Sequence, residues 1–172
     1  MPVGIASVSL PSASIDVPAM IKRKDGVVKK LTGGVTQLLK GNKIDFYHGR
    51  GSLEAGRKVS VAPADGGDAV ELEADNVILA AGSEPITIPN VDYDGEYIVD
   101  NVGALDFDEV PETLGVIGAG VIGLELGSVY ARLGAEVTVI EFLDVITPGM
   151  DKEVQRSFKR ILEKQGLSFV MG

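Results

Sequence analysis

The stretch of residues 113–127, TLGVIGAGVIGLELG, constrains this chain more than any other part of it. A short apolar run that ends in Ile117 is followed by a G-x-G-x-x-G pattern made by Gly118, Gly120 and Gly123. Apolar residues then recur at helical spacing as far as Leu133. The glycines therefore lie where a buried strand turns into a helix, and this context is the one that a dinucleotide site requires.

Each glycine of such a turn has its own task. We expect Gly118 to make the tight turn and Gly120 to let a pyrophosphate approach the backbone. Gly123 should let the helix pack closely against the sheet. The phosphates would then face the free N–H groups of the helix start. The same predicted site includes the neighbouring residues Ala119, Val121, Ile122, Leu124 and Glu125.

The residues after this helix support the prediction. Gly134 should end the helix, and Glu136–Glu141 has the composition of a second strand. Glu141 ends that strand at about the position where dinucleotide-binding units carry the acid that binds the ribose. A carboxylate there accepts hydrogen bonds from the 2′-OH and repels a 2′-phosphate, which favours NAD over NADP. The alternative is a turn with chance glycines and a solvated Glu141.

Composition excludes several classes of function. The chain has 172 residues, of which 45% are hydrophobic and 24% charged, so it should be globular. Its net charge of −9 is unlike that of a nucleic-acid-binding protein. No apolar run is long enough to span a bilayer. The first residues, Met1–Ile5, lack the pattern of a signal peptide, which predicts an intracellular protein.

The chain contains no cysteine and one histidine, His48. Thiol catalysis, disulfides and cysteine metal sites are therefore excluded within these residues, and no histidine cluster can form. His48 lies in an apparent strand, Ile44–His48, and we interpret it as structural or solvent-facing.

The first half of the chain predicts a long helix followed by an antiparallel meander. Asp16 is a candidate N-cap of a helix that runs to about Lys40 and ends at Gly41-Asn42. Its basic cluster (Lys22, Arg23, Lys24, Lys29 and Lys30) is a candidate anion site, although we favour a solvated helix face. The expected strands of the meander are Ile44–His48, Leu53–Val61 and Ala69–Glu73, with an interruption at Gly49-Arg50-Gly51 and a turn at Pro63–Gly67.

A continuous apolar run, Val77–Ala81, should form a parallel strand that is covered on both faces. A connector with two prolines follows it, and we place a domain boundary near Val110. After Glu141, Asp151 should cap another helix, and Leu167–Met171 should form a third strand. The apolar face expected for this helix consists of Val154, Phe158, Ile161 and Leu162. The fold class is thus α/β, and its second part is a mononucleotide-binding half.

Four segments resemble the dihydrolipoyl dehydrogenase family, the flavoprotein component of 2-oxo acid dehydrogenase complexes. They are Leu31–Val35, Val77–Glu84, Val116–Gly127 and Val137–Asp144. The resemblance extends over essentially the whole chain, which corresponds to an internal part of such an enzyme. It implies a partial FAD-binding domain, residues 1–110, with the antiparallel meander and one parallel strand. The first half of a Rossmann-type NAD-binding domain, residues 111–172, would follow.

The resemblance also assigns roles by position. Gly51 matches a glycine whose backbone approaches the FAD adenine, and Ala81, Gly82 and Ser83 match the end of a strand that passes the flavin dinucleotide. Where the family has Ala-Thr-Gly, this chain has Ala81, a change that removes a hydroxyl. Glu125 resembles a glutamate that supports the flavin side of the site, although a polar residue on a half-buried helix is the alternative. Val121 stands where other reductases carry a gating Tyr.

The family's first glycine motif, its redox cysteines and its C-terminal His-Glu pair have no counterpart here. The resemblance therefore implies that these residues alone are inactive and bind FAD weakly or not at all, with NAD and FAD as the cofactors of the complete enzyme. That enzyme would be a cytoplasmic or mitochondrial-matrix homo-oligomer that joins a 2-oxo acid dehydrogenase complex. Open strand edges also favour a homo-oligomer, or a poorly cooperative monomer, for the chain itself. Alternatives are a mercuric reductase or transhydrogenase type of flavin disulfide reductase, or a non-catalytic nucleotide-binding module.

Overall fold

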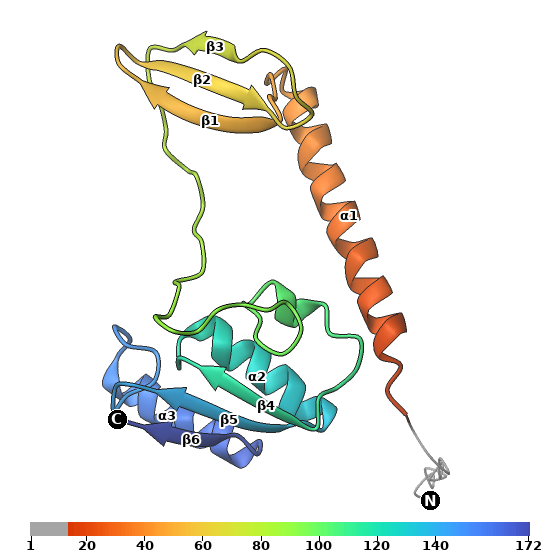
Figure 1. Cartoon of the computed structure of the whole chain (residues 1–172), viewed down its shortest axis with the longest axis vertical. Helices are drawn as coiled ribbons and strands as arrows, with labels where there is room; N and C mark the ends of the chain where they lie inside the picture. The colour runs from red at the N-terminus through yellow and green to blue at the C-terminus, as the bar shows by residue number, and fades with distance from the viewer. Residues whose placement is uncertain (1–13) are drawn as a thin grey trace, which may run out of the picture. The chain divides into compact units, whose positions relative to one another are not determined.

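The computed structural model describes residues 14–172. The prediction that Met1–Ile5 is not part of a signal peptide concerns residues outside this range. Contacts divide the described chain into two compact units. One unit is Asp25–Glu84, and the other is Pro85–Gly172 together with the described residues up to Lys24. Each unit contains its own three-stranded sheet, as Figure 1 shows, so the α/β prediction is confirmed.

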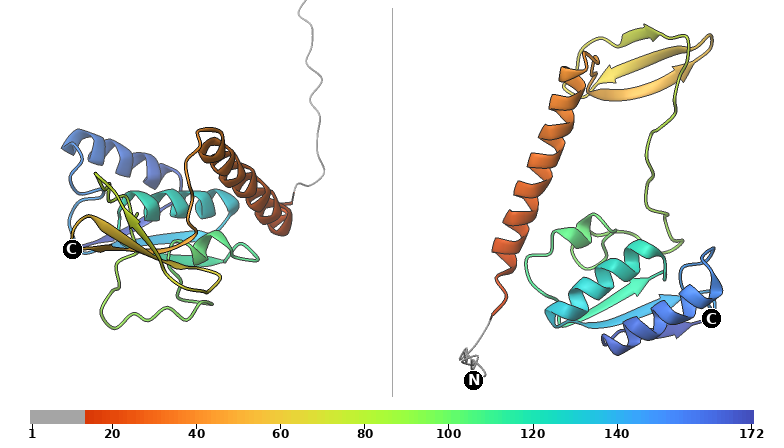
Figure 2. Two further views of the ribbon diagram at one scale, coloured as in Figure 1. Left: turned by 90° about the horizontal axis from the view of Figure 1, so that it is seen from above. Right: turned by 180° about the vertical axis from the view of Figure 1, so that it is seen from behind.

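The second unit contains a parallel β-α-β-α-β arrangement. Its strands are β4 (Thr113–Ile117), β5 (Glu136–Glu141) and β6 (Ser168–Met171), paired in the order β4-β5-β6. The register aligns Val116 with Val139, and Val139 with Phe169. The helices α2 (Val121–Leu133) and α3 (Lys152–Lys164) connect these strands. Both helices lie on the same face of the sheet (Figure 2), as right-handed crossovers require when strands follow in sequence order.

The space between this sheet and its helices holds a continuous apolar core. Leu124 of α2 and Val137 and Val139 of β5 are fully buried, and Ile146 and Leu162 are nearly so. Burial of a Leu or Val side chain contributes about 1.5–3 kcal/mol, so these side chains supply much of the stability of the unit. The opposite face of the sheet is open, because Ile117, Ile140 and Val170, aligned across the three strands, are exposed.

The predicted helix ends of this unit are confirmed. Gly134 is the C-cap residue of α2 at a φ of 115°, a conformation that favours glycine. The Asp151 carboxylate accepts hydrogen bonds from the N–H groups of Glu153 and Val154 at the start of α3. The apolar face predicted for α3 is shifted, however. Val154 and Ile161 are exposed, and the buried side consists of Gln155 and Leu162, with Phe158 beside them.

Helix α1 (Val17–Gly41) begins and ends as predicted. The Asp16 carboxylate accepts a hydrogen bond of 2.8 Å from the N–H of Ala19 and so caps the first turn. Among its residues only Val17 is buried, and Leu31 and Leu38 are each about two-thirds exposed. The apolar stripe of α1 therefore has no cover among the described residues.

The meander forms, with corrected strand boundaries. Its strands are β1 (Gly49–Glu54), β2 (Lys58–Pro63) and β3 (Val70–Glu73), paired antiparallel in this order. The predicted interruption at Gly49–Gly51 is wrong because these residues pair with β2, and the predicted strand Ile44–His48 is irregular. The single strand predicted for Leu53–Val61 is split by a turn in which Arg57 has a φ of 64°. The turn after β2 and the strand at β3 agree with prediction.

The predicted parallel strand Val77–Ala81 does not form. These residues belong to no helix or strand, and Ile78 and Leu79 are 89% and 76% exposed. A parallel strand needs a neighbour to accept and donate its hydrogen bonds. No described residue pairs with this segment, so its apolar composition alone does not order it as a strand.

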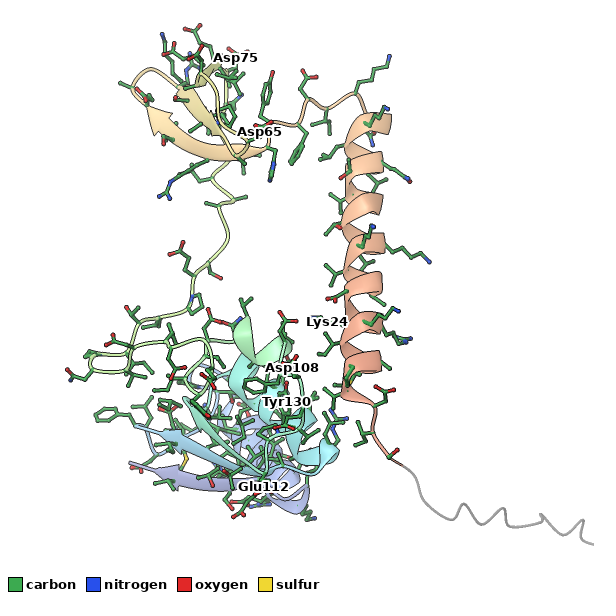
Figure 3. The ribbon with its side chains drawn as sticks, turned by 45° about the vertical axis from the view of Figure 1, so that its right-hand side comes forward. Lys24, Asp65, Asp75, Asp108, Glu112 and Tyr130 are labelled. Atoms are coloured by element: carbon green, nitrogen blue, oxygen red, sulfur yellow. The ribbon has the colours of Figure 1, made fainter. Side chains whose placement is uncertain are left out.

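The segment before β4 is organised by hydrogen bonds to carboxylates and by one tyrosine. The Asp94 carboxylate accepts three backbone N–H bonds, led by Ile98, and these hold its pKa below the usual value. The Tyr130 hydroxyl donates to the Ala104 carbonyl at 2.5 Å, and the Tyr130 ring lies 5.4 Å from that of Phe107. Lys24 forms an ion pair with Asp106 nearby, and Figure 3 labels Lys24 and Tyr130.

No helix within residues 14–172 is long and apolar enough to cross a membrane.

Candidate functional site

The loop between β4 and α2 contains three glycines, and the structure gives each a different reason to be glycine. Gly118 has a φ of 96°, which strains any residue with a side chain. At Gly123 an added Cβ would lie 2.9 Å from the Gly118 carbonyl oxygen and 3.0 Å from Val116 Cγ1, so close helix–strand packing requires glycine there. At Gly120 the φ is −75° and an added Cβ would meet nothing within 4 Å.

Gly120 differs from the other two glycines of the loop. Neither its own conformation nor the packing of the described residues requires glycine, and the residue is exposed. The open space at this position is where an external group could approach the backbone. The three glycines thus have the conformation, the open approach and the packing that the sequence pattern predicts for a dinucleotide-binding turn.

Helix α2 begins at this loop with N–H groups that no side chain caps. The N-cap residue is Gly120, and the first intrahelical bond runs from the Leu124 N–H to the Gly120 carbonyl at 3.1 Å. The N–H groups of the first turn of an α-helix have no partner within the helix, and the helix dipole adds positive potential there. Val121 and Ile122, which carry two of these groups, are exposed. An anion can therefore approach this helix start.

Glu141 ends β5 beside the same loop. Its Oε2 accepts a hydrogen bond of 2.7 Å from the Ala119 N–H, and its Oε1 accepts one of 2.9 Å from the Leu143 N–H. The Gly118 N–H donates to the Ile140 carbonyl at 2.8 Å, so β5 also holds the turn itself. The carboxylate lies half-buried at the end of the sheet, next to the start of α2. A negative group and a row of N–H donors are thereby brought together.

The other predicted residues of this loop fall into two groups. Ala119 and Leu124 are fully buried, so they can contribute only backbone atoms to a ligand. Glu125 is exposed on α2, and the structure gives its side chain no role in the loop.

The residues predicted to contact a flavin lie in the unit formed by Asp25–Glu84. Gly51 lies in β1 opposite Val61, whereas Ala81, Gly82 and Ser83 lie in the exposed irregular segment after β3. An added Cβ at Gly51 would meet only Val59 Cγ1, at 3.9 Å, an ordinary contact distance. At Gly49 it would lie 2.2 Å from the Ala62 carbonyl oxygen. The sheet therefore requires glycine at position 49, whereas a Cβ could be accommodated at position 51.

Two residues that the sequence did not single out support the glycine loop from inside. The Thr147 N–H donates to the Ala119 carbonyl at 2.8 Å, and the Gln155 side-chain amide donates to the Thr147 carbonyl at 3.1 Å. Gln155 could have been found, because it precedes Phe158 and Leu162 by three and seven residues on one helical face. Thr147 could not, because nothing in the sequence indicates its φ of 43°.

A cavity of about 380 Å³ lies elsewhere, between the loop after β5 and α3. Its lining includes Ile146, Pro148, Met150 and Arg156 but none of the predicted site residues. Residues 14–172 also contain no group of three or more His, Cys, Asp or Glu side chains that could hold a metal ion. The loop and Glu141 therefore remain the candidate site, and its chemistry is that of hydrogen bonding to a polar anionic ligand.

Two solved structures resemble this chain over most of its length. The chain superposes on LpdA from Mycobacterium tuberculosis with a TM-score of 0.81 and 27% identity, over 94% of this chain and 36% of that chain. It superposes on RclA from Escherichia coli, a flavoprotein disulfide reductase, with a TM-score of 0.74 and 25% identity, over 92% of this chain and 36% of that chain.

Two relatives found by sequence are dihydrolipoyl dehydrogenases. Dihydrolipoyl dehydrogenase 3 of Pseudomonas aeruginosa is 48% identical over 94% of this chain and 34% of its own length. Mitochondrial dihydrolipoyl dehydrogenase 1 of Arabidopsis thaliana is 44% identical over 95% of this chain and 32% of its own length. The chain thus spans about a third of the length of these relatives. The family model described as pyridine nucleotide-disulphide oxidoreductase matches residues 4–172, and the chain belongs to this family.

Proposed function

We propose that the Gly118–Glu125 loop and Glu141 bind the adenosine ribose and the pyrophosphate of NAD. One observation carries this proposal: the 2.7 Å hydrogen bond from the Ala119 N–H to Glu141 Oε2, which sets a carboxylate beside an uncapped helix start. The helix start offers N–H donors to the phosphates, and the carboxylate offers acceptors to the ribose hydroxyls.

The proposed preference for NAD over NADP follows from the bonding of Glu141. Each of its oxygens accepts one backbone N–H, and a carboxylate oxygen has a second lone pair. Two acceptor positions therefore remain for ribose hydroxyls. A 2′-phosphate would instead bring its negative charge toward a carboxylate that the backbone already holds in place.

We propose that, in a longer enzyme of the relatives' type, this chain contributes to NAD-dependent oxidation of dihydrolipoamide to lipoamide. FAD would carry electrons between the thiol substrate and NAD when bound. Gly51, Ala81, Gly82 and Ser83 would form one wall of the flavin site, and the exposed backbone at Gly51 is compatible with close approach of an adenine. Glu125 would support the flavin side. The functional boundary in this proposal stays near Val110, with residues 1–110 on the FAD side and 111–172 on the NAD side.

Two further proposals concern assembly and location. A complete enzyme of this type would be a homo-oligomer within a 2-oxo acid dehydrogenase complex, in the bacterial cytoplasm or the mitochondrial matrix. The Arabidopsis relative carries the word mitochondrial in its name, which supports the second location. The exposed row of Ile117, Ile140 and Val170 is an apolar surface that association with another copy would cover.

A second candidate function is another type of flavin disulfide reductase. The structural similarity to RclA, whose name describes such a reductase, favours this alternative. The loop and Glu141 would bind nucleotide in both cases, so the thiol or metal substrate is what distinguishes them. A non-catalytic nucleotide-binding module would share the site as well.

The experiment is a titration of the chain with NAD⁺ and NADP⁺ by isothermal calorimetry. We expect NAD⁺ to bind at least about fivefold more tightly, on the order of 1 kcal/mol. Glu141→Ala should narrow this difference, whereas Glu136→Ala, at the exposed beginning of the same strand, should leave it unchanged. Equal or tighter binding of NADP⁺ to the unchanged chain would contradict the proposed preference.

A second assay tests the predicted inactivity of these residues alone. With added FAD and dihydrolipoamide, we expect the chain to form no NADH, because it carries no redox cysteines and no His-Glu pair. We also expect the purified chain to carry no stoichiometric flavin. NADH formation that depends on lipoamide, or a yellow protein, would refute this part of the proposal.

A further inference from the structure

The peptide bond between Ala119 and Gly120 is held from the inside of the protein. Ala119 is fully buried, and its N–H donates to Glu141 Oε2. Its carbonyl oxygen accepts a hydrogen bond of 2.8 Å from the Thr147 N–H. Both polar groups of this residue are therefore fixed, one by the strand end and one by the loop that follows it.

Thr147 is itself held in an unusual conformation. It is a β-branched residue at a φ of 43° and is only 2% exposed, which is a strained arrangement for such a side chain. Its carbonyl accepts hydrogen bonds from the Gln155 amide at 3.1 Å and from the Met150 N–H at 3.2 Å. Backbone strain of this kind persists only where the surroundings hold it, and it gathers at functional sites.

Gln155 joins this arrangement from α3. It is 8% exposed, and Gln155 and Thr147 are the two buried polar residues within the described part of the chain. Buried polar groups are costly unless they are hydrogen-bonded. The Gln155 amide donates to the Thr147 main-chain carbonyl, whereas the buried Thr147 hydroxyl has no hydrogen-bond partner among the described residues. A chain of hydrogen bonds thus runs from Gln155 to Thr147, from Thr147 to Ala119, and from Ala119 to Glu141.

The direction of one N–H group follows from this chain. In a planar trans peptide the C=O and the N–H point in opposite directions. The Ala119 carbonyl points to buried Thr147, so the N–H of the same peptide unit, which belongs to exposed Gly120, points away from the core. It emerges where α2 begins and where an added Cβ would meet nothing.

We propose that Gln155 and Thr147 are positioning residues that aim the Gly120 N–H at a phosphate of the bound dinucleotide. This inference rests on the proposed NAD site. Without the Gln155 amide, the Thr147 carbonyl keeps only its bond to Met150, and the strained loop can relax. The Ala119–Gly120 peptide then loses its fixed orientation before a nucleotide arrives.

Gln155→Leu tests the proposal, because leucine has a similar size and no donor. We expect this variant to bind NAD⁺ about tenfold more weakly, the loss of one oriented hydrogen bond to a charged oxygen. Binding of adenosine, which has no phosphate, should change less than twofold. Gln165→Leu, at the exposed end of α3, is the matched control and should bind NAD⁺ as the unchanged chain does.

A measurement on the unchanged chain keeps the test decisive if Gln155→Leu fails to fold. In ¹H–¹⁵N spectra, addition of NAD⁺ should move the Gly120 amide resonance more than that of Ala119, whose N–H faces Glu141. NAD⁺ binding without a change at Gly120 would overturn the positioning role alone, as would a folded Gln155→Leu variant with unchanged affinity. Absence of any NAD⁺ binding would contradict the proposed function first and this role with it.

Discussion

The parallel sheet with α2 and α3 and the region of α1 and the meander differ in how they use their apolar residues. In the first region Leu124, Val137 and Val139 are fully buried within one contiguous stretch of sequence. In the second, Val61 is the buried apolar residue of the three strands, and the apolar stripe of α1 is exposed. A β-α-β-α-β unit closes its own core, whereas a helix and a meander of this size leave apolar surface uncovered.

The most sensitive test of this difference is hydrogen exchange. Amides of β5, which pair on both sides, should exchange with an opening free energy near that of the whole unit. Amides of Val77–Ala81, which form no strand, should exchange nearly unprotected. We expect protection to differ by a factor on the order of 10³, as a unit of ordinary stability allows. Mass spectrometry of peptic fragments measures it, and comparable protection in both segments would show that the second is ordered in solution.

A matched pair of substitutions compares the two regions directly. Leu124→Ala should lower the free energy of unfolding by about 3 kcal/mol, because it leaves a cavity in a packed core. Leu79→Ala removes the same atoms from a side chain that is 76% exposed and should change it by less than about 0.5 kcal/mol. Urea unfolding followed by circular dichroism gives both values. Similar losses for the two variants would contradict the contrast.

Helix caps allow a smaller test. Asp151→Ala removes two hydrogen bonds at the start of α3 and should lower the stability of the parallel-sheet region by about 1 kcal/mol. Asp16→Ala removes the corresponding bond in α1, whose residues beyond Val17 are not buried. It should reduce the helical signal and leave the main unfolding midpoint nearly unchanged. A shift of that midpoint as large as the Asp151→Ala shift would mean that α1 folds cooperatively with the core.

Tyr130 gives the smallest expected effect and a dependence on pH. Tyr130→Phe removes the bond to the Ala104 carbonyl and should cost somewhat less than 1 kcal/mol at neutral pH. Burial, with a further contribution from Asp106 that Lys24 opposes, raises the pKa of Tyr130 above its ordinary value of 10.0. The folded chain therefore holds this proton more tightly than the unfolded chain.

The sign of the pH effect follows from that difference. The contribution of Tyr130 is fully present below the unfolded pKa, and it is lost as pH rises from about 10 through the folded pKa. Tyr130→Phe should flatten this alkaline loss, whereas Tyr97→Phe, at an exposed position, should not. Unfolding by urea at a series of alkaline pH values measures both. An unchanged slope in the Tyr130 variant would exclude its burial as the cause.

Local signals predicted the region that closes its own core. The glycine pattern, Gly134 and Asp151 mark the ends of α2 and the start of α3, and their caps form as expected. The strand predictions were wrong where pairing with a neighbouring strand decides whether a segment forms a strand. Val77–Ala81 has the composition of a buried strand, but no described neighbour pairs with it, and Gly49–Gly51 forms a strand because β2 pairs with it. The composition of a segment indicates that it can form a strand, but the strand forms only when a neighbouring strand pairs with it.

The candidate site also combines features that local sequence predicts with features that depend on tertiary contacts. The loop and Glu141 were predictable because a fixed spacing along one β-α-β unit brings them together. The support from Thr147 and Gln155 was not predicted, because it depends on a positive φ in a non-glycine residue and on a tertiary contact across eight residues. Sequence patterns record the groups that meet a ligand more readily than those that hold such groups in place.

The hydrogen bonds around the glycine loop also have a kinetic consequence. Gly118 is tied to Ile140, and Ala119 to both Glu141 and Thr147, by hydrogen bonds within the protein itself. The entropy of ordering the loop is thus lost when the chain folds and not when a nucleotide arrives. A binding site that needs no rearrangement should associate with its ligand at a rate limited by encounter, with no slow phase that is independent of ligand concentration.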